Sequence, residues 1–236
     1  DFREWSDIKP IDLGEPRRHW RNELYTTMLQ PYPRAPYLLI GIPLRTVPRR
    51  PLQGGSFGLS ESALMYSRDG ERFTIMDEAF LRPGRDSRNW TKHGNMFGWG
   101  MVQTARDELS FYYQQHDHQE TAHLRRATLR LDGFSSLHAG RYPGGVAISR
   151  PLVFSGRELE VNFATGAGGG LSVGLIDAVS GQVIPGFEQS VELFGDRIAA
   201  VVSWKGGGDL RKLAGRRVRL KLTMYDADLY SLRFRP

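Results

Sequence analysis

The chain has 236 residues, enough for one large domain or two ordinary ones. Its 27 glycines and 13 prolines favour a protein built from strands and turns over a helical one. The absence of cysteine excludes disulfides and thiolate metal sites. Because no stretch is apolar over the roughly 18 residues that a spanning helix needs, membrane insertion is not expected.

The net charge of +6 raises the question of an anionic partner such as nucleic acid. The arginines are scattered in short groups beside predicted strands and turns, which favours solvated strand faces and a few buried pairs; a surface for an anionic ligand is the alternative. Nucleic-acid signatures and phosphate-binding glycine loops are absent, so neither nucleic acid nor a cofactor is expected. The densest arginine groups are residues 17–18, 49–50, 125–126 and 216–219.

Residues 1 to about 140 are predicted to form short strands that pair as hairpins. A loose unit of about 40–45 residues recurs, which is typical of propeller blades. Roughly three such blades cannot close a ring. Since the chain begins at Asp1 and not at Met, either a signal peptide has been removed or an upstream part is missing. We expect a partial, N-terminally truncated β-propeller-like region, with another β arrangement as the alternative. The expected strands are residues 24–29, 37–42, 63–67, 73–76, 98–104, 109–114 and 124–131.

Residues 141–236 alternate apolar and polar side chains more regularly. This period of two places one face of each strand on a core and predicts an antiparallel β-sandwich of jelly-roll or carbohydrate-binding-module type. Glycine-rich residues 166–170 and 206–208 are predicted loops. One helical turn is expected between Asp209, which can cap it, and Gly215, which can end it. The apolar sets are Leu159, Val161 and Phe163; Leu171, Val173 and Leu175; Val218, Leu220, Leu222 and Met224; and Leu232 and Phe234.

The segment Ser-Arg-Asp-Gly-Glu-Arg-Phe at residues 67–73 suits a tight hairpin. Asp69 can accept hydrogen bonds from the backbone that follows it, and Gly70 can adopt a positive φ. The pattern resembles the Asp-box hairpins of sialidase-like propellers, where it forms a structural turn. Arg68 nevertheless offers a guanidinium at the surface of this turn.

An aromatic and proline-rich stretch contains Tyr32 and Arg34. Aromatic rings stack on sugar faces, and arginine forks hold carboxylates or hydroxyls, so both residues are candidate sugar contacts. The alternative is a rigid polyproline-like connection that packs its tyrosines on a core. Arg68, Trp90 and His93 are further candidate contacts.

Glycoside cleavage usually needs two carboxylates on either side of the bond. Glu23 is the candidate catalytic residue, because it stands at the start of a predicted strand beside Trp20 and Tyr25, a place that can face a propeller axis. The sequence alone pairs no two carboxylates in space. A Ser-His-Asp triad also remains open, although no nucleophile-elbow sequence supports it.

Two segments contain residue types that bind metals. His116, His118 and Glu120 offer two imidazoles and a carboxylate, but an exposed polar hairpin loop explains them as well. Asp226 and Asp228 lie in a predicted turn between the last two strands and could bind calcium, or could shape the turn and pair with arginines. The structural explanation is preferred for both segments, so no metal is expected.

Seven segments carry a resemblance to a known group of proteins: residues 65–70, 124–134, 151–165, 184–187, 195–197, 202–205 and 226–234. They resemble uncharacterised, often secreted proteins of planctomycete-type bacteria that are labelled as family 32-like glycosyl hydrolase homologues. The resemblance extends from about Tyr25 onward and implies a five-bladed β-propeller followed by a β-sandwich. It further implies that a first catalytic carboxylate comes from an early blade, absent from a truncated chain, and that Glu23 begins a middle blade where related propellers place a carboxylate.

The resemblance implies a carbohydrate-active protein, a glycoside hydrolase fragment acting on an extracellular or periplasmic polysaccharide or oligosaccharide. Two alternatives stay open: a non-catalytic, lectin-like carbohydrate-binding module, and a structural domain of a surface protein. Carbohydrate is the expected partner, and the sequence makes no prediction of the oligomeric state.

Overall fold

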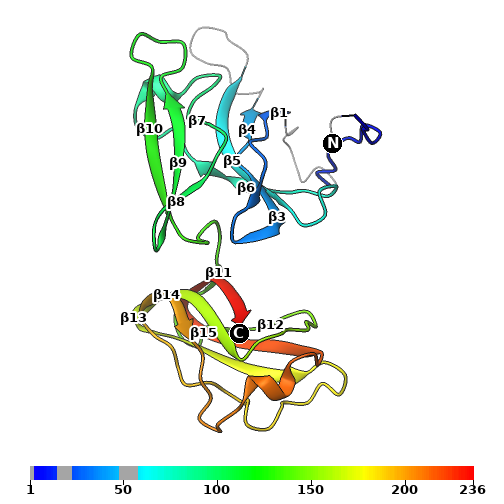
Figure 1. The fold of residues 1–236 in the computed structure, drawn as a ribbon. Coiled ribbons are helices and arrows are strands. Elements are labelled where there is room, and N and C mark those ends of the chain that lie inside the picture. The colour runs from blue at the N-terminus through cyan, green and yellow to red at the C-terminus, as the bar shows by residue number, and fades with distance from the viewer. Residues whose placement is uncertain (1–2, 15–22, 48–57) are drawn as a thin grey trace. The chain divides into compact units, whose positions relative to one another are not determined.

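The computed structural model describes residues 3–14, 23–47 and 58–236, which form an all-β protein of curled antiparallel sheets (Figure 1). The chain divides into two compact units, Asp1–Thr128 and Leu129–Pro236. The border expected near residue 140 falls inside the second unit, because strand β11 (Leu137–Ala139) pairs with β15 (Val218–Arg235).

The first sheet of the first unit has the layout of a propeller blade. β1 pairs with β4 and β2 with β3. β1 and β2 therefore together form one long strand, and β3 and β4 together form its antiparallel neighbour. β5 pairs with β3 and β4, and also with β6. The chain thus runs up and down four times, as in a blade. The strands are β1 (Glu23–Thr26), β2 (Gln30–Tyr32), β3 (Ala35–Gly41), β4 (Leu44–Val47), β5 (Leu59–Ser67) and β6 (Thr74–Leu81).

The second sheet of this unit is built around β9, which pairs with β7, β8 and β10. On β9 the buried side chains of Leu109, Phe111 and Tyr113 alternate with the exposed ring of Tyr112, as expected for a half-buried strand. The described residues therefore contain two blade-like sheets, and the prediction of roughly three blades is too high for them. The strands are β7 (Met96–Phe97), β8 (Val102–Ala105), β9 (Glu108–Gln115) and β10 (His123–Arg130).

Aromatic rings join the two sheets of the first unit. The ring of Phe80 on β6 lies 6.1 Å from that of Phe97 and 6.3 Å from that of Phe111, measured between centroids. The Ser62 hydroxyl donates to the Asn95 carbonyl at 2.6 Å, and both residues are buried. These contacts fix the segment between β6 and β7 against β5, and this segment contains much of the candidate site.

The proline-rich stretch is a tight hairpin, with the turn at Pro33 and Arg34 between β2 and β3. Strands β2 and β3 therefore extend into the interval between the predicted strands 24–29 and 37–42. Tyr32 is 4% exposed and belongs to the core, as the alternative explanation of this stretch expected. Its ring is not available to a ligand at the surface.

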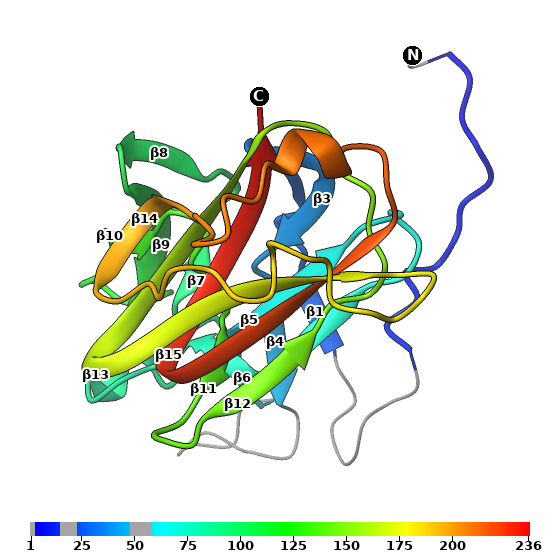
Figure 2. The same ribbon diagram turned by 90° about the horizontal axis from the view of Figure 1, so that it is seen from below.

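The second unit is a single five-stranded sheet that curls over one core. Its central strands β13 and β15 bend along their length (Figure 2). Both halves of β13 place side chains in the same hydrophobic cluster: Leu159 and Phe163 before the bend, Leu171 and Leu175 after it. The curled sheet thus covers both sides of the core, as in a sandwich. The remaining strands are β12 (Gly145–Ile148), β13 (Glu158–Asp177) and β14 (Asp196–Val201).

Two predicted breaks in this unit are wrong. Residues 166–170 lie within β13, and the segment around Asp226 lies within β15. Thr165 pairs with Ala227 and Gly170 with Tyr225, so residues 166–169 form a bulge opposite Asp226 alone. Asp226 has a φ of +43° and donates its N–H to Gly140 at 2.7 Å. The glycines indicate a close approach of two strands and not a loop.

The expected helical turn is confirmed as a 3-10 turn, Leu210–Leu213. The Asp209 carboxylate accepts a hydrogen bond from the Arg211 N–H at 3.0 Å, and Gly215 adopts a φ of +79°. Among the described residues, the other helical element is Ser87–Asn89 in the first unit. Within the described residues, neither helix has the length and apolar character that a membrane span requires.

Candidate functional site

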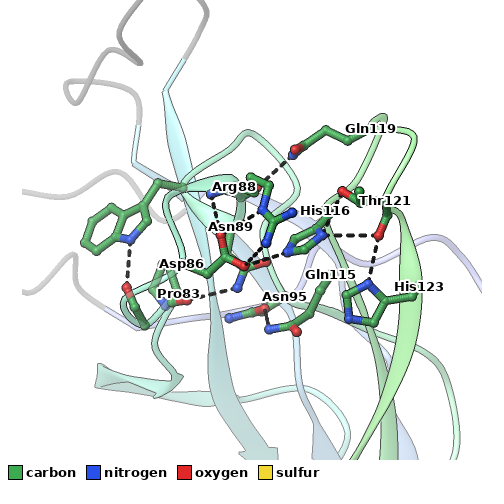
Figure 3. A network of polar contacts seen from close by, with 12 residues as sticks. Pro83, Asp86, Arg88, Asn89, Asn95, Gln115, His116, Gln119, Thr121 and His123 are labelled. Carbon is green, nitrogen blue, oxygen red and sulfur yellow. Dashed lines mark hydrogen bonds and ion pairs between the residues drawn. The ribbon is translucent and has the colours of Figure 1, made fainter.

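Two loops of the first unit meet at one end of the second sheet. Residues 82–95 connect β6 to β7, and residues 116–122 connect β9 to β10. Because Met96 pairs with Gln114, both loops leave the sheet at the same end (Figure 3). Titratable and aromatic side chains gather here, so we treat these loops as the candidate site.

Asp86 is the centre of a polar network that joins the loops. Its Oδ1 accepts hydrogen bonds from the Arg88 backbone N–H at 3.1 Å and from Arg88 Nε at 3.0 Å. Its Oδ2 lies 2.9 Å from Arg88 Nη2 and 2.9 Å from His116 Nε2 (Figure 3). The bonds from the Arg88 guanidinium and N–H, with a smaller contribution from His116, hold the pKa of Asp86 well below its usual range. Asp86 is thus a persistent carboxylate.

His116 completes a row of carboxylate, imidazole and hydroxyl. Its ring is buried, with Nδ1 lying 3.0 Å from Thr121 Oγ1 and 3.1 Å from the Thr121 carbonyl oxygen. The same three groups occur in nucleophilic relays. Here the row also holds the loops together, and the Gln119 amide adds a bond to the Arg88 carbonyl at 2.8 Å. Because the His116 ring is buried, we interpret these contacts as a link between the two loops.

Replacing Asp86 with asparagine should weaken the acid sensitivity of the fold. Asparagine can still accept the Arg88 N–H but has no charge. Because the folded-state pKa of Asp86 is lowered, its stabilising effect is present above the unfolded-state pKa, about 3.9, and is lost as the pH falls below that value. We expect a lower melting temperature than wild type at pH 7 and a smaller further decrease between pH 5 and pH 3, followed by circular dichroism. Equal decreases in melting temperature between pH 5 and pH 3 in both proteins would contradict a stabilising role of the Asp86 carboxylate.

A second cluster lies on the same loops. The Asp117 carboxylate is 2.9 Å from His93 Nδ1 and 3.3 Å from His118 Nε2, measured from its Oδ2. The Gln114 amide donates to the other oxygen, Oδ1, at 2.9 Å. The Tyr25 ring of β1 stacks on His93 with 4.9 Å between centroids. The cluster therefore contains two imidazoles, a carboxylate and an aromatic ring.

Of the predicted site residues, the structure brings Glu23 and His93 to one region. Glu23 is exposed and lies two residues before Tyr25 on β1, and the Tyr25 ring contacts His93. Trp90 lies on the same loop as His93. Arg34 lies at the β2–β3 turn and Arg68 in the β5–β6 hairpin, so both belong to other turns.

The hairpin at residues 67–73 is the structural turn that the sequence predicts. The Asp69 carboxylate accepts the N–H groups of Arg72 at 2.8 Å and Glu71 at 2.9 Å, and these bonds lower its pKa. The Ser67 hydroxyl accepts the Gly70 N–H at 2.9 Å, and Gly70 has a φ of +77°. No ligand role follows for this turn.

Asp86 is not among the site residues predicted from the sequence. The structure also groups His93 and His118 around Asp117, a combination that the sequence does not predict. Asp86 had a local signal, since an aspartate two residues before Arg88 can cap a short helical turn. In the predicted set of His116, His118 and Glu120, the His116 ring bonds to Asp86 instead of facing His118. The partner of His118 is Asp117, which is not among the ligands predicted from the sequence.

Asp226 and Asp228 do not form the proposed calcium turn. Both lie on β15, where the Asp228 carboxylate accepts a hydrogen bond from the Ser136 hydroxyl at 2.6 Å and lies 3.0 Å from His138 Nδ1. Asp228 therefore pairs with a hydroxyl and an imidazole within a strand, and not with the arginines that the structural explanation expected at a turn.

No family model matches the sequence, and neither a curated protein nor a solved structure matches it. The resemblance to family 32 glycosyl hydrolases therefore stays an expectation. Function is argued below from the geometry of the site.

Proposed function

We propose that this chain binds carbohydrate through exposed aromatic rings at the candidate site of its first unit. The observation that supports this most directly is that the Trp90 ring is both exposed and fixed in position. Its side chain is exposed at 43%, yet the indole N–H donates to the Gly84 carbonyl at 2.8 Å. The ring is held in place while part of it meets solvent, which lowers the entropic cost of stacking a sugar on it.

Tyr25 supplies a second ring that is fixed in position. It is 62% exposed and stacks on His93 at an interplanar angle of 27°. Carbohydrate ligands present apolar C–H faces and hydroxyl edges. The two rings suit the faces, while the exposed carboxylate of Glu23, two residues before Tyr25 on β1, suits the hydroxyls. We define Tyr25, Trp90 and Glu23 as the proposed sugar contacts.

Hydrolysis is the second candidate, and one observation favours it. Asp117 is in contact with His93, which Tyr25 contacts in turn, so a second carboxylate belongs to the region of Glu23. Two carboxylates near one sugar are the usual requirement for glycoside cleavage. The substrate would then be a polysaccharide or oligosaccharide outside the cell or in the periplasm, as the family resemblance implies.

Replacing Trp90 with alanine should weaken binding of the best sugar ligand by about tenfold or more, because a stacked ring contributes on the order of 1 kcal/mol beyond its buried area. The ligand would come from a glycan-array screen, and its affinity would be measured by isothermal titration calorimetry. Phe194→Ala is the matched control: Phe194 is an aromatic residue of the second unit with 68% exposure, and its removal should leave the affinity unchanged.

Glu23→Gln separates binding from hydrolysis in the same experiment. If the chain cleaves its ligand, the variant should bind with little change and lose turnover. Binding without turnover in the wild type would support a lectin-like module. An absence of binding to any glycan, or an affinity that Phe194→Ala lowers as much as Trp90→Ala does, would contradict the proposed contacts.

A further inference from the structure

We propose that His93, Asp117 and His118 bind a divalent transition-metal ion of the zinc class. One ligand atom from each of the three residues can be chosen such that all lie within 4.8 Å of one another. Two imidazoles and one carboxylate are the donor set that zinc and its neighbours accept in proteins. No metal is expected here from the sequence, and the proposal does not depend on the binding of sugar.

Two of the three distances between the donor atoms are near those of a metal site, and all three are within 4.8 Å. Asp117 Oδ2 lies 2.9 Å from His93 Nδ1 and 3.3 Å from His118 Nε2. Zinc bonds to nitrogen and oxygen are about 2.0–2.1 Å long, so neighbouring ligands of a tetrahedral ion are about 3.3 Å apart. An ion can therefore occupy the cluster with small movements of these side chains.

The carboxylate of the cluster is oriented before any ion arrives. The Asp117 side chain is 11% exposed, and the Gln114 amide binds its Oδ1 at 2.9 Å, which leaves Oδ2 to face the two imidazoles. Asp117 and His118 are the central residues of a turn closed by a hydrogen bond from the Gln119 N–H to the His116 carbonyl at 3.1 Å. His118 adopts a φ of +57°, an uncommon conformation for a residue with a side chain.

The proposed site has an open side. His118 is 84% exposed at its side chain, whereas His93 is 15% exposed and held by Tyr25. Three protein ligands leave a fourth position to water or to an external group, which is the arrangement of catalytic and not of structural zinc sites.

The test is calorimetric titration of the tag-free full chain with zinc chloride after removal of metals by chelation. The expected result is one bound ion per chain. His118→Ala should weaken binding at least about tenfold, since loss of even an outer-shell partner costs 10–100-fold. The exposure of His118 makes this variant safe for folding, which circular dichroism would verify. Asp117→Asn should weaken binding similarly.

His138→Ala is the matched control. His138 also contacts an aspartate, with Nδ1 3.0 Å from Asp228 Oδ1, and its side chain is 65% exposed, but it lies in the second unit. This variant should bind zinc like the wild type. The proposal is overturned if the wild type shows no binding below about 1 mM, or if His118→Ala binds as tightly as the wild type.

Discussion

Replacing Phe163 with alanine should lower the free energy of unfolding of the second unit by about 3–5 kcal/mol. Phe163 lies on β13 just before the bend and is fully buried in the cluster that the curled sheet covers. The Arg197 guanidinium lies over its ring, 5.6 Å from the centroid. Alanine would leave a cavity that neighbours from both halves of β13 cannot fill without straightening the bend.

Urea denaturation followed by circular dichroism would measure this effect. Phe194→Ala is the control, because Phe194 is 68% exposed and its removal should change the stability by no more than about 0.5 kcal/mol. A loss below about 1 kcal/mol for Phe163→Ala would mean that the two halves of β13 do not share one core.

Replacing Gly169 with alanine should destabilise the second unit by about 1–3 kcal/mol or more. A Cβ at this position would lie 2.2 Å from the backbone carbonyl oxygen of Asp226. Backbone atoms cannot rotate away as a flexible side chain can, so the paired strands β13 and β15 would have to separate at the bulge. The same denaturation experiment measures the change.

Gly168→Ala is the matched control within the same bulge. A Cβ at Gly168 would meet no atom within 4 Å. Alanine restricts the unfolded chain more than glycine does, so this variant should be neutral or slightly stabilising, by up to about 1 kcal/mol. Equal losses in the two variants would show that chain flexibility, and not the close approach of the strands, requires the glycines.

The bulge explains why the sequence predicts a loop at residues 166–170, where the structure has a strand. Five residues with four glycines suggest a loop when neighbouring residues alone are considered, and Gly166–Gly170 was predicted as one. The glycines instead create space: a Cβ at Gly166 would lie 2.0 Å from the Asp226 carboxylate. Asp226 is 60 positions later in the sequence, so no local pattern contains this requirement.

The hairpin at Asp69 and the turn at Asp209 were predictable for the opposite reason. In each, a carboxylate accepts hydrogen bonds from N–H groups two or three residues further on: Arg72 for Asp69 and Arg211 for Asp209. Such bonds form within one turn of chain and depend little on the rest of the fold.

The all-β class and most strand positions in both units followed from the sequence by itself, because alternation of apolar and polar residues is a property of each strand. Tertiary structure alone decided the candidate site. His93 meets Asp117, and Asp86 meets His116, only because β7 and β9 pair in one register and bring the ends of two loops together. Sheet register is set by the packing of the whole face, so side-chain partners across loops are not encoded in any local pattern.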